Sequence, residues 1–314
     1  MRVIFHYAAG AELARRLDGL TSDGLDVAVI PPTEEAAFAE ALPSCDVLWH
    51  VLKPATRAVM EAAPKLRLIQ KMGAGVDTID LAAARERGIP VCNLPGTNSQ
   101  AVAEHALALM LSILRKIPQF DRETRDGKGW SWPKERQAEL GEIHGKTVGL
   151  IGFGATASRL APVLSVLGAD VIYWSRREVT DAKARFVSLD ELVTRSDIIS
   201  LHVPLNDTTR HLIDAERMSR MKRGAILINT ARGGLVDPAA LLTALKSGQL
   251  AGAGLDTFAV EPVETDNALL ALDSVVIAPH IAWLTLQTFE RSFDRMAENC
   301  RRLAAGQELL YRVV

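Results

Sequence analysis

Short apolar segments recur along this chain and alternate with longer segments whose apolar residues are spaced three and four apart. The short segments contain mainly Val, Ile and Leu, and the longer ones are rich in Ala, Glu and Arg. This alternation is typical of parallel sheets, because a parallel strand is reached through a crossover connection that is usually a helix. The sequence therefore predicts an α/β fold with parallel sheets that carry helices on both faces.

The alternation occurs twice, which predicts two doubly wound domains. The predicted strands of the first series are 2–8, 26–30, 46–51, 66–72 and 89–93. The predicted strands of the second series are 146–153, 170–174, 197–203, 225–230, 250–258 and 274–279. Six strands with short or helical connections are the element count of a Rossmann-type dinucleotide-binding domain.

A break rich in Pro and Gly at 93–100 separates the two series. It is followed by a predicted apolar helix at 101–116 and, at 125–135, by a polar loop with two tryptophans. The last segment, 284–309, has the pattern of one helix with an apolar stripe, which fits either domain. We assign it to the first domain, which then becomes discontinuous. The predicted domains are residues 1–97 with 285–314, and residues 98–284.

Composition and charge exclude several classes of protein. The chain is 48% hydrophobic with a net charge of −2, which is ordinary for a folded protein and predicts no nucleic-acid partner. The strongest candidate for a membrane span, 106–114, is too short, so we expect no membrane association. Cys45, Cys92 and Cys300 fit no metal or redox spacing, and the histidines show none either. We therefore expect no metal site and a reducing, cytoplasmic location.

The segment "GLIGFGATAS" (149–158) follows a predicted strand and opens a predicted helix. Gly152 and Gly154 occupy the first two glycine positions of the G-x-G-x-x-G fingerprint, and Ala157 occupies the third. The first glycine permits the tight turn, the second lets the backbone approach a pyrophosphate, and the third affects only helix–strand packing. The alternative is a glycine-rich turn without a ligand. The predicted cofactor contacts here are Gly152, Phe153, Gly154, Ala155 and Thr156.

The end of the next predicted strand, "VIYWSRRE", bears on which dinucleotide is bound. An Asp or Glu at this place accepts hydrogen bonds from the ribose and repels a 2′-phosphate. Here the position is Ser175, followed by Arg176 and Arg177, and this combination suits a 2′-phosphate. The sequence predicts a preference for NADP(H), with NAD(H) or dual use as the alternative if both arginines are merely solvated.

Charged side chains follow three consecutive predicted strands of the second series. Arg232 follows 225–230, Asp256 and Glu261 lie at or just beyond the end of the next strand, and His280 follows the last one. Ligands in such sheets bind beyond the carboxyl ends of the strands, so we expect these side chains to lie together.

These side chains suit the reduction of a 2-oxo acid. Arg232 can bind the carboxylate and polarise the carbonyl group, and His280 can donate a proton to the developing alkoxide. Glu261 can orient the imidazole and keep its pKa high enough for an acid near neutral pH. Taken singly, each residue also has a purely structural interpretation, and the prediction depends on their joint placement. His105, in the predicted apolar helix, is interpreted as a core or interface residue.

The chain resembles the D-isomer-specific 2-hydroxyacid dehydrogenases along almost its whole length. The matching segments are "GAGVDTID" (73–80), "NLPGTNSQAVAEHALALML" (93–111), "GKTVGLIGFG" (145–154), "LHVPLNDTTRHLID" (201–214), "LINTARGGLVD" (227–237), "GLDTFAVEP" (254–262) and "APHIA" (278–282). The family's catalytic Arg, Glu and His fall on Arg232, Glu261 and His280. Its departures here are Ala157 and Ser175, and the second resembles the NADP-using glyoxylate/hydroxypyruvate reductase branch.

The resemblance implies further properties. It implies a flavodoxin-like substrate domain, a Rossmann dinucleotide-binding domain, and a homodimer formed through the latter, to which the helix 101–116 and the loop 125–135 would belong. It implies that backbone N–H groups of Ala74 and Gly75 bind the substrate carboxylate, beside Arg232 and His280. The remaining cofactor contacts that it implies are Pro204, Thr208, Ala231 and Asp256, the last for the nicotinamide amide.

The function predicted from these residues is hydride transfer between NAD(P)H and a small 2-oxo acid, with glyoxylate or hydroxypyruvate as substrate. One alternative is a D-3-phosphoglycerate-type dehydrogenase, although we expect no regulatory domain after the core and only Lys53 and Arg57 offer a basic cluster for a phosphate. Another is a dinucleotide-sensing, corepressor-like scaffold. A formate- or phosphite-type oxidant would need a different substrate loop. Whether Trp49, Trp132 and Trp283 line the pocket stays open.

Overall fold

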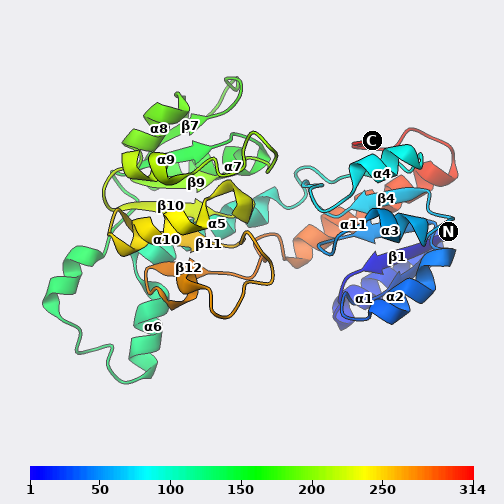
Figure 1. Ribbon diagram of the computed structural model, residues 1–314, viewed down its shortest axis with the longest axis horizontal. Helices are drawn as coiled ribbons and strands as arrows, with labels where there is room; N and C mark the ends of the chain where they lie inside the picture. Colours follow the sequence, from blue (N-terminus) through cyan, green and yellow to red (C-terminus); the bar gives the residue numbers. More distant parts are fainter. The chain divides into compact units, whose positions relative to one another are not determined.

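The chain folds into two compact units. The computed structural model describes residues 1–314, apart from the side chains of Ser22, Asp23 and Glu135. Unit 1 consists of Met1–Asn98 and Thr285–Val314, and unit 2 of Ser99–Leu284 (Figure 1). Each unit contains one parallel sheet, which confirms the predicted fold class of two doubly wound domains.

Unit 1 has a sheet of five parallel strands in the order β2-β1-β3-β4-β5. The strands are β1 (Arg2–His6), β2 (Asp26–Val29), β3 (Val47–His50), β4 (Leu68–Lys71) and β5 (Val91–Cys92). All five lie within predicted segments. The order is that of flavodoxin-like sheets.

Helices cover both faces of this sheet. Those of unit 1 are α1 (Ala11–Asp18), α2 (Glu35–Ala41), α3 (Arg57–Glu61), α4 (Leu81–Glu86) and α11 (Leu286–Ala304). The C-terminal helix α11 packs on the sheet through Phe293, whose ring lies 5.6 Å from that of Phe5 and 6.0 Å from that of Trp49. Asp294 of the same helix pairs with Arg16 of α1 at 2.9 Å. The prediction of one helix over 284–309 was too long, because α11 ends at Ala304.

Unit 2 has a sheet of seven parallel strands in the order β12-β11-β10-β9-β6-β7-β8. The strands are β6 (Thr147–Ile151), β7 (Asp170–Trp174), β8 (Arg185–Phe186), β9 (Ile198–Leu201), β10 (Ala225–Asn229), β11 (Leu250–Leu255) and β12 (Val275–Ile277). The strand order reverses between β6 and β9, where doubly wound sheets bind their ligands. The prediction of six strands missed β8, whose two exposed residues carry no apolar pattern.

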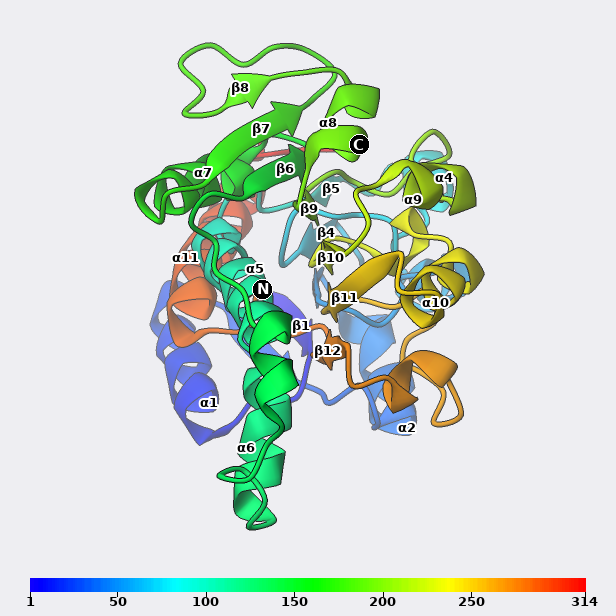
Figure 2. The ribbon, with the colours of Figure 1, turned by 90° about the vertical axis from the view of Figure 1, so that its left-hand side faces the viewer.

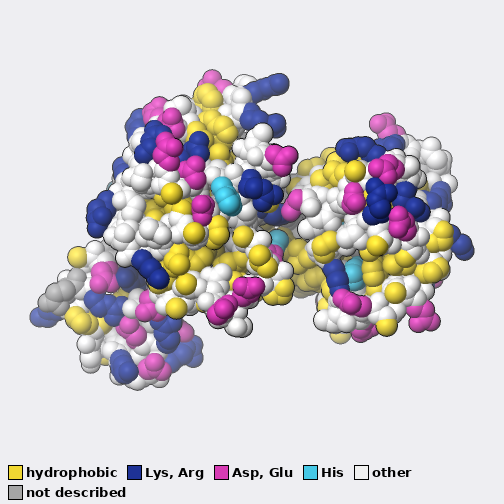
Figure 3. Space-filling model, in the orientation of Figure 1, with side chains coloured by type: hydrophobic (Ala, Val, Ile, Leu, Met, Phe, Trp, Pro, Cys, Tyr) yellow, Lys and Arg dark blue, Asp and Glu magenta, His cyan; other side chains and the backbone are white. Residues whose placement is uncertain are grey.

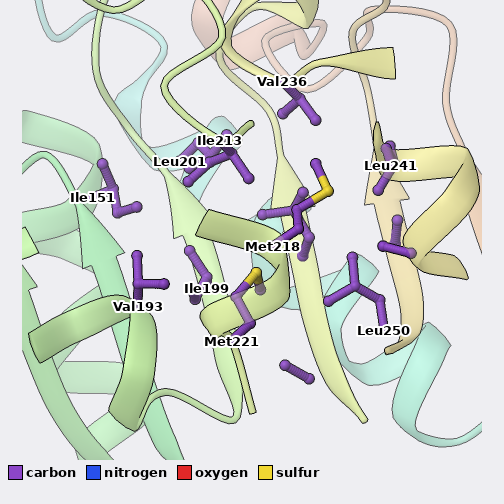
Figure 4. Packing of buried hydrophobic residues seen from close by; sticks show 14 of the residues in the cluster. Ile151, Val193, Ile199, Leu201, Ile213, Met218, Met221, Val236, Leu241 and Leu250 are labelled. Carbon is purple, nitrogen blue, oxygen red and sulfur yellow. The ribbon is translucent and has the colours of Figure 1, made fainter. Parts of the chain in front are cut away.

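The helices of unit 2 divide between the two faces of its sheet (Figure 2). They are α5 (Ser99–Leu114), α6 (Ile117–Arg125), α7 (Ala155–Val166), α8 (Leu189–Arg195), α9 (Ala215–Arg220) and α10 (Pro238–Lys246). Side chains of α5 and α7 share one buried cluster with the sheet, and those of α8, α9 and α10 share another. Figure 4 shows part of the second cluster, in which Met221 lies beside Ile199.

The apolar helix α5 is explained by the core of unit 2. Its residues Ala106, Leu109, Met110 and Leu114 are almost completely buried in the cluster that α7 completes. A subunit interface is therefore not needed to explain its apolar character. The predicted dimer stays a prediction, and Trp130 in the loop after α6 is 91% exposed.

The surface mixes charges of both signs. On the face drawn in Figure 3, Lys and Arg side chains are interspersed with Asp and Glu. Among the described residues, no helix combines the length and the apolar character that crossing a bilayer requires.

Candidate active site

The loop between β6 and α7 is built by two glycines with different constraints. Gly152 has a φ of 94°, and a Cβ atom there would lie 2.5 Å from the carbonyl oxygen of His202. Gly154 precedes the first residue of α7, and a Cβ atom there would meet no atom within 4 Å. Ala157, at the third fingerprint position, is completely buried in the core. The fold thus requires Gly152, whereas the space beside Gly154 is open.

This loop fits the pyrophosphate of a dinucleotide. The 12-residue helix α7 has no side-chain cap at its N-terminus, so its first N–H groups are available to an anion. The open space at Gly154 gives such an anion access to the backbone. Of the predicted contacts in this loop, Phe153 can offer only its backbone, because its ring packs against Tyr173 with centroids 4.1 Å apart.

The end of β7 presents an exposed basic pair. Arg176 and Arg177 are both exposed, and within the described part of the chain neither has an acidic partner. The hydroxyl of Ser175 donates to the carbonyl oxygen of Arg177, which folds the turn back on itself. Two guanidinium groups without a counter-charge are available to an anionic ligand at this strand end.

Three further predicted cofactor contacts lie in the loops after β9 and β10. Pro204 and Thr208 occupy one turn, which is closed by the hydroxyl of Thr209 donating to the Pro204 carbonyl oxygen at 2.7 Å. The N–H of Ala231 donates to Oδ1 of Asn229 at 3.1 Å. Both loops extend from the carboxyl edge of the sheet of unit 2, the edge that also carries Gly152.

Glu261 and His280 form the central pair of the site. Nδ1 of His280 lies 2.7 Å from Oε2 of Glu261, and Oε1 of Glu261 accepts the N–H of Phe258 at 2.9 Å. Burial alone would raise the pKa of Glu261, but the hydrogen bonds from His280 and Phe258 and the positive charge of Arg232 hold it below its ordinary value. The carboxylate is thus ionised near neutral pH, and Nε2 is the ring nitrogen left for a substrate.

Arg232 is brought to this pair by a close approach of two loops. A Cβ atom on Gly233 would lie 1.9 Å from the carbonyl carbon of Phe258, so only glycine permits the contact. The carbonyl oxygen of Arg232 accepts from Nδ2 of Asn229 at 2.9 Å, and its Nη1 donates to the carbonyl oxygen of Ala231 at 2.8 Å. The loops after β10, β11 and β12 thereby bring together the three predicted catalytic side chains.

Asp256 anchors the backbone of the His280 loop. Its carbonyl oxygen accepts the N–H of His280 at 2.8 Å, and its carboxylate oxygens accept those of Ile281 and Ala282 at 2.8 and 3.0 Å. The side chain is only 1% exposed, and burial raises its pKa against the opposing effect of these N–H groups. His280 itself has a φ of 57°, a conformation that a non-glycine residue holds only when its surroundings impose it.

Sequence reasoning missed His105 as part of this network. Nε2 of His105 on α5 lies 3.5 Å from Oδ1 of Asp256. The two residues are far apart in the sequence, and the position of His105 in an apolar helix was the only available signal.

The predicted carboxylate-binding residues Ala74 and Gly75 belong to unit 1. They follow β4 in a loop where Gly73 has a φ of 130° and where Nδ2 of Asn93 donates to the carbonyl oxygen of Ala74 at 2.8 Å. Neither the N–H of Ala74 nor that of Gly75 has an acceptor among the residues the structure describes. Their availability to an anion agrees with the predicted role, which stays a prediction.

The three tryptophans occupy different environments. Trp49 is completely buried in the core of unit 1, and Trp132 packs edge-on against Phe120 with centroids 5.5 Å apart. Trp283 is 8% exposed, and its Nε1 donates to the carbonyl oxygen of His280 at 3.0 Å. Only Trp283 therefore contacts a predicted catalytic residue directly.

Comparison with known proteins identifies the family. The model of the D-isomer specific 2-hydroxyacid dehydrogenase, NAD binding domain, matches residues 107–282, which is more than half of the chain. The chain belongs to this dehydrogenase family. It is an enzyme that acts on small 2-hydroxy or 2-oxo acids and uses a nicotinamide dinucleotide.

Similar proteins include members with different substrates. This 2-hydroxyacid dehydrogenase is 39% identical to a glyoxylate reductase from Korarchaeum cryptofilum, over 88% of this chain and 85% of that one. It is 38% identical to a D-3-phosphoglycerate dehydrogenase from Archaeoglobus fulgidus, over 92% of this chain but only 55% of that one. The solved structure of the TT0316 protein from Thermus thermophilus has a TM-score of 0.90 and 37% identity, with both chains fully covered.

Proposed function

We propose that this dehydrogenase reduces glyoxylate or hydroxypyruvate with NADPH as the preferred cofactor. The observation that carries the proposal is the 2.7 Å contact between His280 and an ionised Glu261, next to Arg232. An imidazole held by a carboxylate is suited to donate a proton, and a neighbouring guanidinium is suited to bind a carboxylate.

The residues divide the reaction between them. The loop between β6 and α7 would hold the pyrophosphate of the cofactor, which would supply a hydride for the carbonyl carbon of the substrate. Arg232 binds the substrate carboxylate and polarises the carbonyl group, and the proton on Nε2 of His280 passes to the carbonyl oxygen. Glu261 keeps its hydrogen bond to Nδ1, which fixes the ring and stabilises its protonated form before the transfer. The products are the hydroxy acid, the oxidised dinucleotide and a neutral imidazole, which regains a proton from solvent.

The preference for NADPH rests on the end of β7. Arg176 and Arg177 have no acidic partner among the described side chains, and Ser175 places no negative charge beside them. A 2′-phosphate would gain charge-assisted hydrogen bonds there, whereas an unphosphorylated ribose loses the carboxylate that usually accepts its hydroxyls.

A D-3-phosphoglycerate-type oxidation is the second candidate, because several relatives of this chain carry that name. The phosphate group of 3-phosphoglycerate would need cations to bind it. However, Lys53 donates to the Pro32 carbonyl oxygen and to Glu35, and Arg57 pairs with Glu86. These two cations of unit 1 are already paired, which favours the smaller substrates.

Two further proposals concern the setting of the enzyme. Cys45, Cys92 and Cys300 are buried and form no disulfide, which supports a reducing location such as the cytoplasm. We also propose a homodimer formed through unit 2, in which the exposed Trp130 would be covered. Light scattering coupled to size exclusion tests the dimer, and a monomer at all concentrations would refute it.

The test of the proposed function is a panel of 2-oxo acids assayed with NADPH and NADH, together with 3-phosphoglycerate assayed with NADP⁺ and NAD⁺. We expect the highest kcat/KM with glyoxylate or hydroxypyruvate and NADPH. Turnover of 3-phosphoglycerate with NAD⁺ at a higher kcat/KM would support the second candidate instead. If no acid in the panel is turned over with either cofactor, the proposed function is wrong.

A further inference from the structure

Asp256 accepts hydrogen bonds from three consecutive residues of the His280 loop. The conformation of this loop therefore depends on the charge state of Asp256. The N–H groups of His280, Ile281 and Ala282 all donate to this one residue, two of them to its carboxylate. The carboxylate is 1% exposed, and a buried charge is costly unless it is hydrogen-bonded and paired. The N–H groups of Ile281 and Ala282 supply hydrogen bonds to the carboxylate but no full positive charge.

Two titratable side chains of unit 2 face this carboxylate. His280 approaches it from the loop after β12, and its ring is already engaged by Glu261. His105 approaches it from α5, with Nε2 at 3.5 Å from Oδ1. That Nε2 atom is buried and has no hydrogen-bond partner of ordinary geometry among the described residues. Burying a polar nitrogen without a hydrogen-bond partner costs free energy. The position of His105 Nε2 beside the Asp256 carboxylate therefore calls for a functional reason.

We propose that His105 is a positioning residue, which keeps Asp256 ionised and thereby holds the loop that carries His280. This inference rests on the proposed function for its catalytic consequence, but its structural part does not. His105 touches neither substrate nor reacting atoms in this scheme. It acts through Asp256, whose carboxylate oxygens hold Ile281 and Ala282 and so maintain the φ of 57° at His280.

The direction of the pH dependence follows from burial. Because burial raises the pKa of Asp256, its ionised form is complete above that raised value and is lost as the pH falls through it. A protonated Asp256 is a weaker acceptor for two backbone N–H groups, and the loop should then loosen. A positive charge or N–H donor on His105 opposes protonation, so its removal should move the transition to higher pH.

The experiment compares the full-length protein with His105→Leu and His105→Gln. The matched control is His144→Gln, which changes an exposed histidine of the same unit. With Ile and Ala labelled by ¹⁵N, the amide signals of Ile281 and Ala282 are followed against pH. We expect the midpoint in His105→Leu to lie about one pH unit higher than in the wild type, the usual size of an effect from one nearby charge. The Gln variant, which keeps an N–H donor, should shift less, and the control should not shift.

The pH profile of activity distinguishes a positioning role of His105 from a merely structural one. In His105→Leu the acidic limb of the kcat/KM profile with glyoxylate and NADPH should shift upwards with the amide midpoint, while the KM for NADPH stays within about twofold of the wild type. Unmoved amide midpoints in both His105 variants, or a uniform loss of activity without a shifted limb, would overturn the proposal. If the wild type reduces no 2-oxo acid, the proposed function fails, and the amide midpoints still decide the role of His105.

Discussion

Replacing Glu261 with Gln removes one negative charge from the site and leaves its shape almost unchanged. In the wild type, Glu261 accepts from Nδ1 of His280 at 2.7 Å and from the N–H of Phe258 at 2.9 Å. The amide of Gln can keep the contact to Phe258, but it cannot stabilise a protonated imidazole by charge. We therefore expect the loss to fall on proton transfer rather than on folding.

The expected fall in kcat/KM depends on how far water reaches the side chains of Glu261 and His280. A hydrogen bond to a charged group contributes about 1.5–3 kcal/mol, which corresponds to about 10- to 150-fold in rate. The Glu261 side chain is 34% exposed and that of His280 is 18% exposed, so water screens part of the charge. We therefore expect the lower part of the range, a fall of about 10- to 30-fold in kcat/KM for glyoxylate reduction.

The assay measures NADPH oxidation at saturating cofactor, with Glu264→Gln as the control. Glu264 is exposed, lies three residues further on and undergoes the same chemical change, so its variant should stay within about twofold of the wild type. In a His280→Ala background, Glu261→Gln should cost little more, because the two side chains act as a unit. Equal activity of Glu261→Gln and wild type, or an equal loss in the control, would refute the reasoning.

Four other variants test separate parts of the site. His280→Ala should lower kcat by at least about 100-fold while leaving the Kd for NADPH nearly unchanged, and a loss confined to cofactor binding would contradict the assignment of the acid. Ser175→Asp combined with Arg176→Ala should reverse the preference from NADPH to NADH, measured as the ratio of kcat/KM values; an unchanged ratio would show that these residues do not select the cofactor. Gly152→Ala should lower the Tm, because its Cβ would lie 2.5 Å from the His202 carbonyl oxygen. Gly154→Ala should keep the Tm of the free protein yet weaken NADPH binding, and equal effects of the two on Tm would be evidence against the open space at Gly154.

The sequence predicted most of the sheets because their strands are short, apolar and separated by clear helical patterns. It could not predict β8, since Arg185 and Phe186 are both exposed and form a strand only by pairing with β7. From its sequence we assign the C-terminal helix to the first domain, but its apolar stripe fits either domain and does not by itself identify the surface on which it packs. The stacking of Phe293 on Trp49 in the core of unit 1 identifies that surface.

The candidate site was predictable where its residues lie at strand ends, and not where it depends on packing across the sheet. Arg232, Glu261 and His280 follow consecutive strands, so the topology alone brings their loops to one edge. The approach of His105 to Asp256 depends instead on how α5 packs against β11, which no local pattern specifies. The closeness of the loops at Gly233, where a Cβ would overlap the backbone of Phe258, is likewise visible only in three dimensions.

The stereochemical outcome of hydroxypyruvate reduction tests the central claim most directly. The purified enzyme is incubated with hydroxypyruvate and NADPH, and the glycerate formed is resolved by chiral chromatography. A D-isomer-specific reductase with His280 as the acid predicts D-glycerate from the wild type and almost none from His280→Ala. Formation of L-glycerate, or undiminished D-glycerate from His280→Ala, would contradict the account.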